Sequence, residues 1–165
     1  MIPRVAREHG LKTMVGAWIS ADRDRNEREI AGLLTLAQAG LVNIAVVGNE
    51  VLLRGDLSEA ELLSYIQRVR VALPEDVPVG CVDAYYQFLE RPALTAACDV
   101  LLPNCYPFWE GTDITMAAPY LRRTLPRELE RARREGGPLQ LAWLRVHDSR
   151  QQEGGPAATE SLVRA

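Results

Sequence analysis

The chain has 165 residues, a formal net charge of −3 and a hydrophobic fraction of 47%. This length is enough for one domain with a substantial core, and the slightly acidic balance offers no basic surface for nucleic acid. No apolar run reaches the roughly 18–20 residues of a membrane span, and residues 1–10 lack the apolar core of a signal peptide. We therefore expect no nucleic-acid partner and no membrane span, and the chain carries no signal that indicates its location.

Helical and strand-like patterns alternate along the chain. The predicted elements, in order, are a helix end closing on Gly10, strand Lys12–Trp18, helix Glu27–Ala39, strand Asn43–Val47, helix Ser58–Leu73, strand Val77–Val82, helix Ala84–Ala97, strand Val100–Asn104, helix Met116–Arg134 and strand Leu139–Leu144. The helix after Ser58 has the clearest start, because Glu61 follows three residues later and completes a capping box. The helix Ala84–Ala97 is predicted to continue around Pro92, whereas the long helix Met116–Arg134 is expected to break at Pro126.

Strands separated by helices predict right-handed βαβ units and a parallel sheet, so the fold class is α/β. Five strands are predicted, whereas a (β/α)8 barrel needs eight. Two architectures therefore fit the pattern: an incomplete barrel and a complete small doubly wound domain.

One strand exit has an unusual composition. The apolar, β-branched run Leu41–Val47 stops abruptly at Gly48, and Asn49 and Glu50 follow directly. Parallel sheets carry their chemistry at the carboxyl ends of the strands, and a carboxyl group held there and partly shielded from water can act as an acid near neutral pH. The alternative is a plain polar strand exit, with Glu50 near the start of the next helix.

Three segments in the same order resemble one enzyme family. The run Val46–Arg54 resembles the acid/base strand of glycoside hydrolase family 17, the β-1,3-glucanases and related transglycosylases. Gly10–Ile19 resembles the preceding strand of that family, and Cys98–Gly111 resembles a later strand with its Asn-x-Tyr/His-Pro-Phe signature. The resemblance implies an incomplete (β/α)8 TIM-type barrel covering about strands 3 to 7, formed by residues 1–142, with a divergent tail over 143–165.

The resemblance also implies an activity and a site. A retaining glycosidase uses two carboxyl groups about 5–5.5 Å apart, one as acid/base and one as nucleophile. Glu50 matches the acid/base, Asn49 the amide that hydrogen-bonds the 2-OH of the sugar, and Tyr106 the hydroxyl near the nucleophile. The implied partner is a β-glucan oligosaccharide or polysaccharide, and family members act mostly outside the cytoplasm.

Three further residues are weaker candidates for substrate binding. Phe108 and Trp109 could form an apolar wall for a sugar ring, and ordinary loop packing is the alternative. Asp83 follows the predicted strand Val77–Val82 and resembles a family aspartate at that position. The alternative is that Asp83 caps the N-terminus of the predicted helix Ala84–Ala97.

The nucleophile of the family has no counterpart here. The last strand is expected at Leu139–Ala142, but Trp143–Ser149 replaces the Glu-containing motif that should follow, and Asp148 and Glu153 are displaced from it. A change of reading frame and a diverged pseudoenzyme both account for such a break. We therefore expect this chain to be an inactive relative of a retaining β-1,3-glucan hydrolase or transglycosylase, with a non-catalytic glucan-binding remnant as the alternative. An unrelated α/β binding module would require three ordered matches by chance.

Other chemistry is not indicated. Cys81, Cys98 and Cys105 are odd in number and lie on or beside predicted strands, so we interpret them as small buried residues rather than a disulfide set. His9 and His147 lack metal-ligand spacing, and no metal or cofactor is expected. An incomplete barrel leaves two strand edges unpaired, which predicts self-association.

Overall fold

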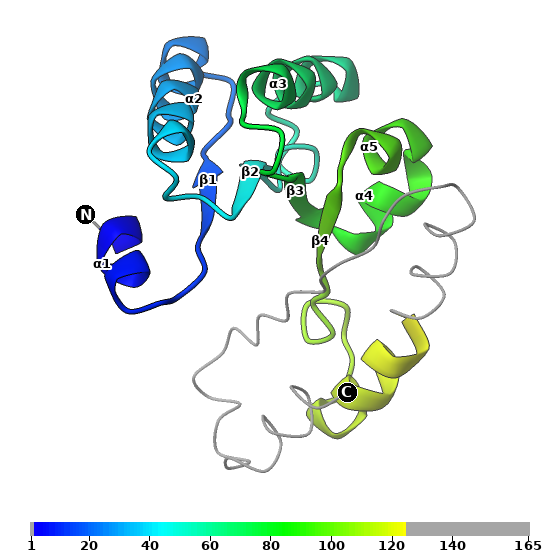
Figure 1. Cartoon of the computed structure of the whole chain (residues 1–165). Helices are drawn as coiled ribbons and strands as arrows, with labels where there is room; N and C mark the ends of the chain where they lie inside the picture. The colour runs from blue at the N-terminus through cyan, green and yellow to red at the C-terminus, as the bar shows by residue number, and fades with distance from the viewer. Residues whose placement is uncertain (1, 125–165) are drawn as a thin grey trace.

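The computed structural model describes residues 2–124, which fold around a four-stranded parallel sheet of order β1-β2-β3-β4 (Figure 1). The strands are β1 (Met14–Ala17), β2 (Ile44–Asn49), β3 (Val79–Ala84) and β4 (Val100–Asn104). The helices are α1 (Ile2–Glu8), α2 (Arg23–Gln38), α3 (Glu59–Ala72), α4 (Tyr85–Glu90) and α5 (Pro92–Ala97), followed by the 3-10 turn η1 (Ile114–Met116) and a helical stretch over 117–124. The predicted α/β class with a parallel sheet is thus confirmed.

Most predicted elements are present, with shifted ends. The helix predicted from Glu27 starts at Arg23, because the side chain of Asp22 caps it by accepting a hydrogen bond from the Arg25 amide. The third strand lies two residues later than predicted, so that it ends beyond Asp83. The predicted strand Leu139–Leu144 and most of helix Met116–Arg134 fall outside the described residues.

Two predictions about helices had opposite outcomes. The capping box of α3 is confirmed: the Ser58 and Glu61 side chains each accept a hydrogen bond from the other residue's backbone amide. The single helix predicted over Ala84–Ala97 is wrong. Its residues form α4 and α5, and Pro92 stands at the start of the second helix, where its missing N–H costs no intrahelical hydrogen bond.

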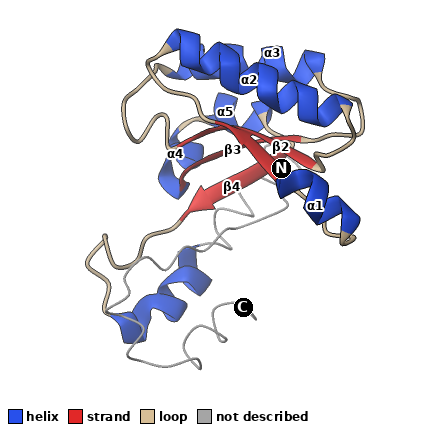
Figure 2. Cartoon of the chain, turned by 90° about the vertical axis from the view of Figure 1, so that its left-hand side faces the viewer, coloured by secondary structure: helices blue, strands red, loops and turns tan. Residues whose placement is uncertain are grey.

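Helices α2, α3 and α5 cover one face of the sheet (Figure 2), and the main core lies between these helices and the strands. Fully buried side chains from this core include Val47 of β2, Leu33 of α2 and Ile66 of α3. Successive strand residues point to opposite faces, so Val46, Val100 and Leu102 form a second, smaller apolar cluster on the other face. The sheet is therefore apolar on both sides, as expected for a parallel sheet.

The three cysteines are buried and form no disulfide with one another, which confirms that they serve as small core residues. Burial raises the pKa of the Cys81 thiol well above its ordinary value and that of Cys98 to about 12. These thiols are therefore protonated and unreactive at neutral pH.

Candidate active site

Glu50 follows the last residue of β2 and lies at the carboxyl end of the parallel sheet. The strand leaves the sheet through two left-handed residues, Gly48 with φ +81° and Glu50 with φ +54°. Only glycine suits the first position, since a Cβ there would lie 2.6 Å from Cγ2 of Val51. Glu50 has no such freedom, and its conformation costs about 1–2 kcal/mol. Strain of this kind is concentrated at functional sites.

The Glu50 carboxyl group is held by side chains from the end of β4. Asn104 donates a hydrogen bond from Nδ2 to Oε1 of Glu50 over 2.7 Å, and the Tyr106 hydroxyl donates to the same oxygen. Asn104 is buried, and the amide of Glu50 donates to the carbonyl of Val82 in β3 over 2.8 Å. Residues from β2, β3 and β4 thus fix the Glu50 carboxyl group at the carboxyl end of the sheet.

Asn49 and Tyr106 lie at the same end of the sheet as Glu50. Asn49 is the last residue of β2 and is half-buried. Tyr106 is also half-buried and starts the segment after β4. The arrangement brings a carboxyl group, a phenol and a carboxamide together at a partly open surface, which suits proton transfer to a bound polar ligand.

Asp83 is close to this group but faces the protein interior. It is fully buried, and its Oδ2 accepts a hydrogen bond from the Leu52 amide over 3.0 Å, while Oδ1 accepts from the Ala84 amide over 2.8 Å. Burial raises the pKa of Asp83, with the negative charge of Glu50 adding to the effect and the backbone amides opposing it. Asp83 does not cap α4, whose N-cap residue is Ala84 without a side-chain cap.

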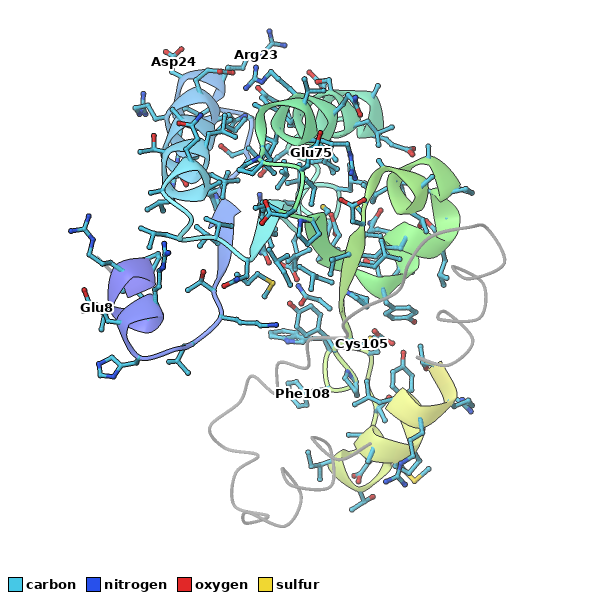
Figure 3. The ribbon with its side chains drawn as sticks, viewed as in Figure 1. Glu8, Arg23, Asp24, Glu75, Cys105 and Phe108 are labelled. Carbon is cyan, nitrogen blue, oxygen red and sulfur yellow. The ribbon has the colours of Figure 1, made fainter. Side chains whose placement is uncertain are left out.

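Phe108 and Trp109 lie on the segment that follows β4, and Figure 3 shows Phe108 beyond Cys105 on this segment. They are 50% and 74% exposed, and their rings meet edge to face with centroids 5.9 Å apart. Their exposure argues against ordinary loop packing and leaves two aromatic surfaces open to solvent.

Sequence reasoning gave no role to three residues that the structure brings to this edge: Asn104, Arg54 and Trp18. All three lie inside the segments that carry the family resemblance. Asn104 ends a predicted strand, so the rule that drew attention to Asn49 would have found it. No local signal indicates that the Arg54 guanidinium lies over the Trp18 ring, 4.6 Å from its centroid.

A second polar cluster joins the segment after β4 to the start of α4. The Tyr120 hydroxyl donates to Glu110 and lies 3.1 Å from the hydroxyl of Tyr85. Burial and these two contacts raise the pKa of Tyr120. The cluster ties the segment that bears Tyr106, Phe108 and Trp109 to the sheet.

Residues 2–124 contain no group of three or more His, Cys, Asp or Glu side chains arranged to hold a metal ion. In the same range, no helix is both long enough and apolar enough to cross a membrane.

Known proteins resemble this chain over most of its length. The sequence profile of the BtgE/BtgC glycoside hydrolase domain matches residues 1–135. The glucan 1,3-beta-glucosidase of Arthroderma benhamiae is 27% identical over 126 residues, which cover 71% of this chain and 39% of that protein.

Solved structures also resemble this chain. An active-site mutant of the Rhizomucor miehei β-1,3-glucanosyltransferase, in complex with laminaritriose, superposes with a TM-score of 0.72 at 27% identity, covering 87% of this chain and 53% of that one. A crystal structure of the glycoside hydrolase family 17 β-1,3-glucanosyltransferase from the same organism gives 0.70 at 26% identity with the same coverage. The chain thus spans about half the length of the solved relatives it matches.

Proposed function

This chain belongs to the BtgE/BtgC glycoside hydrolase domain family, which is of glycoside hydrolase family 17 type, and from that premise we propose that it carries the acid/base half of a β-1,3-glucan-active site. The observation that carries the proposal is the position of Glu50, whose Oε1 accepts hydrogen bonds from Asn104 and Tyr106 at the carboxyl end of the sheet. The relatives supply the substrate class, since their names are those of glucan 1,3-beta-glucosidases and β-1,3-glucanosyltransferases.

The proposed chemistry is retaining hydrolysis or transglycosylation. Glu50 protonates the leaving glycosidic oxygen and then, as a carboxylate, accepts a proton from water or from an acceptor sugar. Asn49 hydrogen-bonds the 2-OH of the reacting sugar. Tyr106 orients Glu50 and lies toward the side from which the nucleophile attacks.

The proposed architecture is an incomplete (β/α)8 barrel. Four parallel strands follow one another in chain order without a reversal, whereas a doubly wound sheet changes direction at a switch point. The helices that follow β1, β2 and β3, namely α2, α3 and α5, lie on one face of the sheet, as in a barrel (Figure 2). We assign residues 1–142 to this partial barrel and residues 143–165 to a divergent tail.

The catalytic cycle also requires a nucleophile, and the sequence provides none at the expected place. No Glu follows Leu139–Ala142 directly. We therefore propose that this polypeptide alone is catalytically inactive. A second function, binding of glucan without turnover, is favoured by the exposed rings of Phe108 and Trp109, because the C–H faces of pyranose rings pack on aromatic side chains.

A chimera tests the proposed role of Glu50. Residues 10–111 of this chain would replace the matching segment of the Rhizomucor miehei β-1,3-glucanosyltransferase, whose remaining residues would complete the enzyme. We expect the chimera to act on laminarin oligosaccharides and Glu50→Gln to lower its turnover by about 10²–10⁴-fold, the usual contribution of a general acid. Glu61→Gln, a matched change in the capping box of α3, should leave turnover intact. Equal activity of the Glu50→Gln chimera and its parent would refute the assignment.

A further inference from the structure

Arg54 contacts the backbone on both sides of Glu50. Its guanidinium donates hydrogen bonds to the carbonyl of Asn49 and, over 2.9 Å, to the carbonyl of Ile19 after β1. Its own amide donates to the carbonyl of Glu50 over 2.9 Å. Arg54 therefore binds the carbonyl groups of both Asn49 and Glu50, which lie on either side of the φ and ψ angles of Glu50. Its bond to Ile19 also links this turn to the end of β1.

The guanidinium is itself fixed in place. It lies over the Trp18 ring, 4.6 Å from the centroid, and forms an ion pair with Asp56 with an N–O distance of 2.7 Å. Only about a quarter of the side chain is exposed, at 27%. A planar guanidinium can serve two carbonyls, one carboxylate and one ring together, whereas a lysine ammonium cannot match this geometry.

The turn after Glu50 is anchored from the other side as well. The buried carboxyl group of Asp83 accepts a hydrogen bond from the Leu52 amide over 3.0 Å. The residues on either side of Glu50 are thus held from β1 and from β3, and the left-handed φ of +54° at Glu50 lies between these two anchors.

We propose that Arg54 is the positioning residue for Glu50: it holds this glutamate in the left-handed conformation that directs its carboxyl group toward Asn104 and Tyr106. The catalytic meaning of this arrangement rests on the proposed function, but the structural claim does not. An L-residue opposes the left-handed conformation and glycine does not, so Arg54 should be needed only while residue 50 has a side chain.

A double-mutant cycle on the full chain tests this relation. Arg54→Met would be measured by thermal unfolding in three backgrounds: Glu50, Glu50→Ala and Glu50→Gly. We expect it to lower Tm equally with Glu50 and with Glu50→Ala, because both oppose the left-handed conformation. In Glu50→Gly the decrease should shrink to roughly half or less. Arg54→Lys should behave as Arg54→Met does, because charge alone does not restore the two carbonyl contacts.

Arg68→Met is the matched control. Arg68 also forms an ion pair, with Glu27, and lies over the ring of Tyr65 at 5.1 Å, but on the helical layer. Its effect should be the same in all three backgrounds. If Arg54→Met unfolds the chain, the Glu50→Gly double variant should fold again. Equal losses for Arg54→Met in the Ala and Gly backgrounds, or failure of the Gly double variant to fold, would overturn the proposal.

Binding of laminaritriose separates this inference from the proposed function. If the unaltered chain binds laminaritriose in titration calorimetry, Arg54→Met and Arg54→Lys should weaken binding about tenfold or more, and Arg68→Met should not. A chain that does not bind this sugar contradicts the proposed function, and the cycle then decides the role of Arg54 by itself. Unchanged binding by the Arg54 variants would overturn the inference while leaving the proposed function in place.

Discussion

The hydroxyl of Tyr106 donates a hydrogen bond to Oε1 of Glu50, although the two residues are 56 positions apart in the chain. Asn104, two residues before Tyr106, donates to the same oxygen over 2.7 Å. The carboxyl group comes from the end of β2 and both donors come from the end of β4, with β3 between them. The parallel sheet in this strand order brings the carboxyl group and both donors to its carboxyl end, so the folded sheet itself assembles this cluster.

Removing the Tyr106 hydroxyl should reduce catalysis more than folding. In the Rhizomucor miehei chimera, we expect Tyr106→Phe to lower turnover roughly tenfold, because loss of one hydrogen bond to a charged group costs about 1.5 kcal/mol. Tyr65→Phe is the control, since the Tyr65 hydroxyl is likewise hydrogen-bonded, accepting from Asn26 Nδ2 over 3.3 Å, but has no hydrogen bond to Glu50 in the described residues. Initial rates on laminarin oligosaccharides, with Tm measured beside them, check this. Similar rates for the two variants would show that Tyr106 acts only in stability.

The buried carboxyl group of Asp83 should make stability depend on pH. Burial raises the pKa of Asp83 in the folded chain, so proton binding favours the folded state. The contribution of this side chain to stability is fully present below the unfolded value of about 3.9 and is lost as pH rises through the raised folded-state pKa. We therefore expect the Tm of Asp83→Asn to rise relative to that of the unaltered chain as pH increases from about 3.9 to the raised folded-state pKa of Asp83. Above that pKa the difference in Tm should stay constant.

Asp113 provides a control of opposite sign. Hydrogen bonds from Thr115 lower the pKa of Asp113, so its contribution is present above about 3.9 and is lost as pH falls through the lowered value. Asp113→Asn should thus lose Tm relative to the unaltered chain as pH rises from acid conditions. Thermal unfolding between about pH 2 and 8 measures both differences. A difference between Asp83→Asn and the parent that does not change with pH would contradict the prediction.

Sequence patterns predicted the parallel sheet and the position of Asn49 and Glu50 at a strand end, because both depend on local regularities. The apolar run before Asn49 and the capping box at Ser58 are signals within a few residues, and β4 was predicted with its observed ends. The contacts of Arg54 with Ile19 and Trp18 could not be predicted, because they depend on how the exits of two neighbouring strands turn. The inward direction of Asp83 is likewise set by tertiary packing, since the residue alone fits a substrate ligand or a helix cap equally well.

The close approach of β3 and β4 depends on a glycine. A Cβ on Gly80 would lie 2.7 Å from the carbonyl oxygen of Val100, a backbone atom that cannot move without separating the strands. We expect Gly80→Ala to lower the free energy of unfolding by about 1–3 kcal/mol. Gly32→Ala is the matched control, because no atom lies within 4 Å of a Cβ added at that position of α2. It should raise stability by about 0.5–1 kcal/mol. Urea unfolding of both variants checks the pair, and equal changes would contradict the argument.

The sheet should make the chain associate with itself through its edges. Among residues 2–124, β1 is hydrogen-bonded only to β2, so its other edge is unpaired within that range. An exposed edge strand is a template for pairing with a second copy, and a lysine on that edge opposes it. We expect Met14→Lys, on β1, to shift the chain toward monomer, and Val71→Lys, at another exposed apolar position but on helix α3, to change nothing. Sedimentation velocity over a range of concentrations tests for self-association. An unaltered chain that remains monomeric at all concentrations would contradict the prediction.

The isolated chain should release no reducing sugar from β-1,3-glucan. Glu50 can protonate a leaving oxygen, but no Glu directly follows the predicted last strand to stabilise the oxocarbenium-like carbon from the opposite face. General acid catalysis alone contributes about 10²–10⁴-fold, well below the 10⁶-fold or more of typical enzymes. Incubation of the purified chain with laminarin, with the chimera as the positive control, measures this. Sugar release that disappears in Glu50→Gln would show that another carboxylate completes the site, and Asp148→Asn and Glu153→Gln would then identify it.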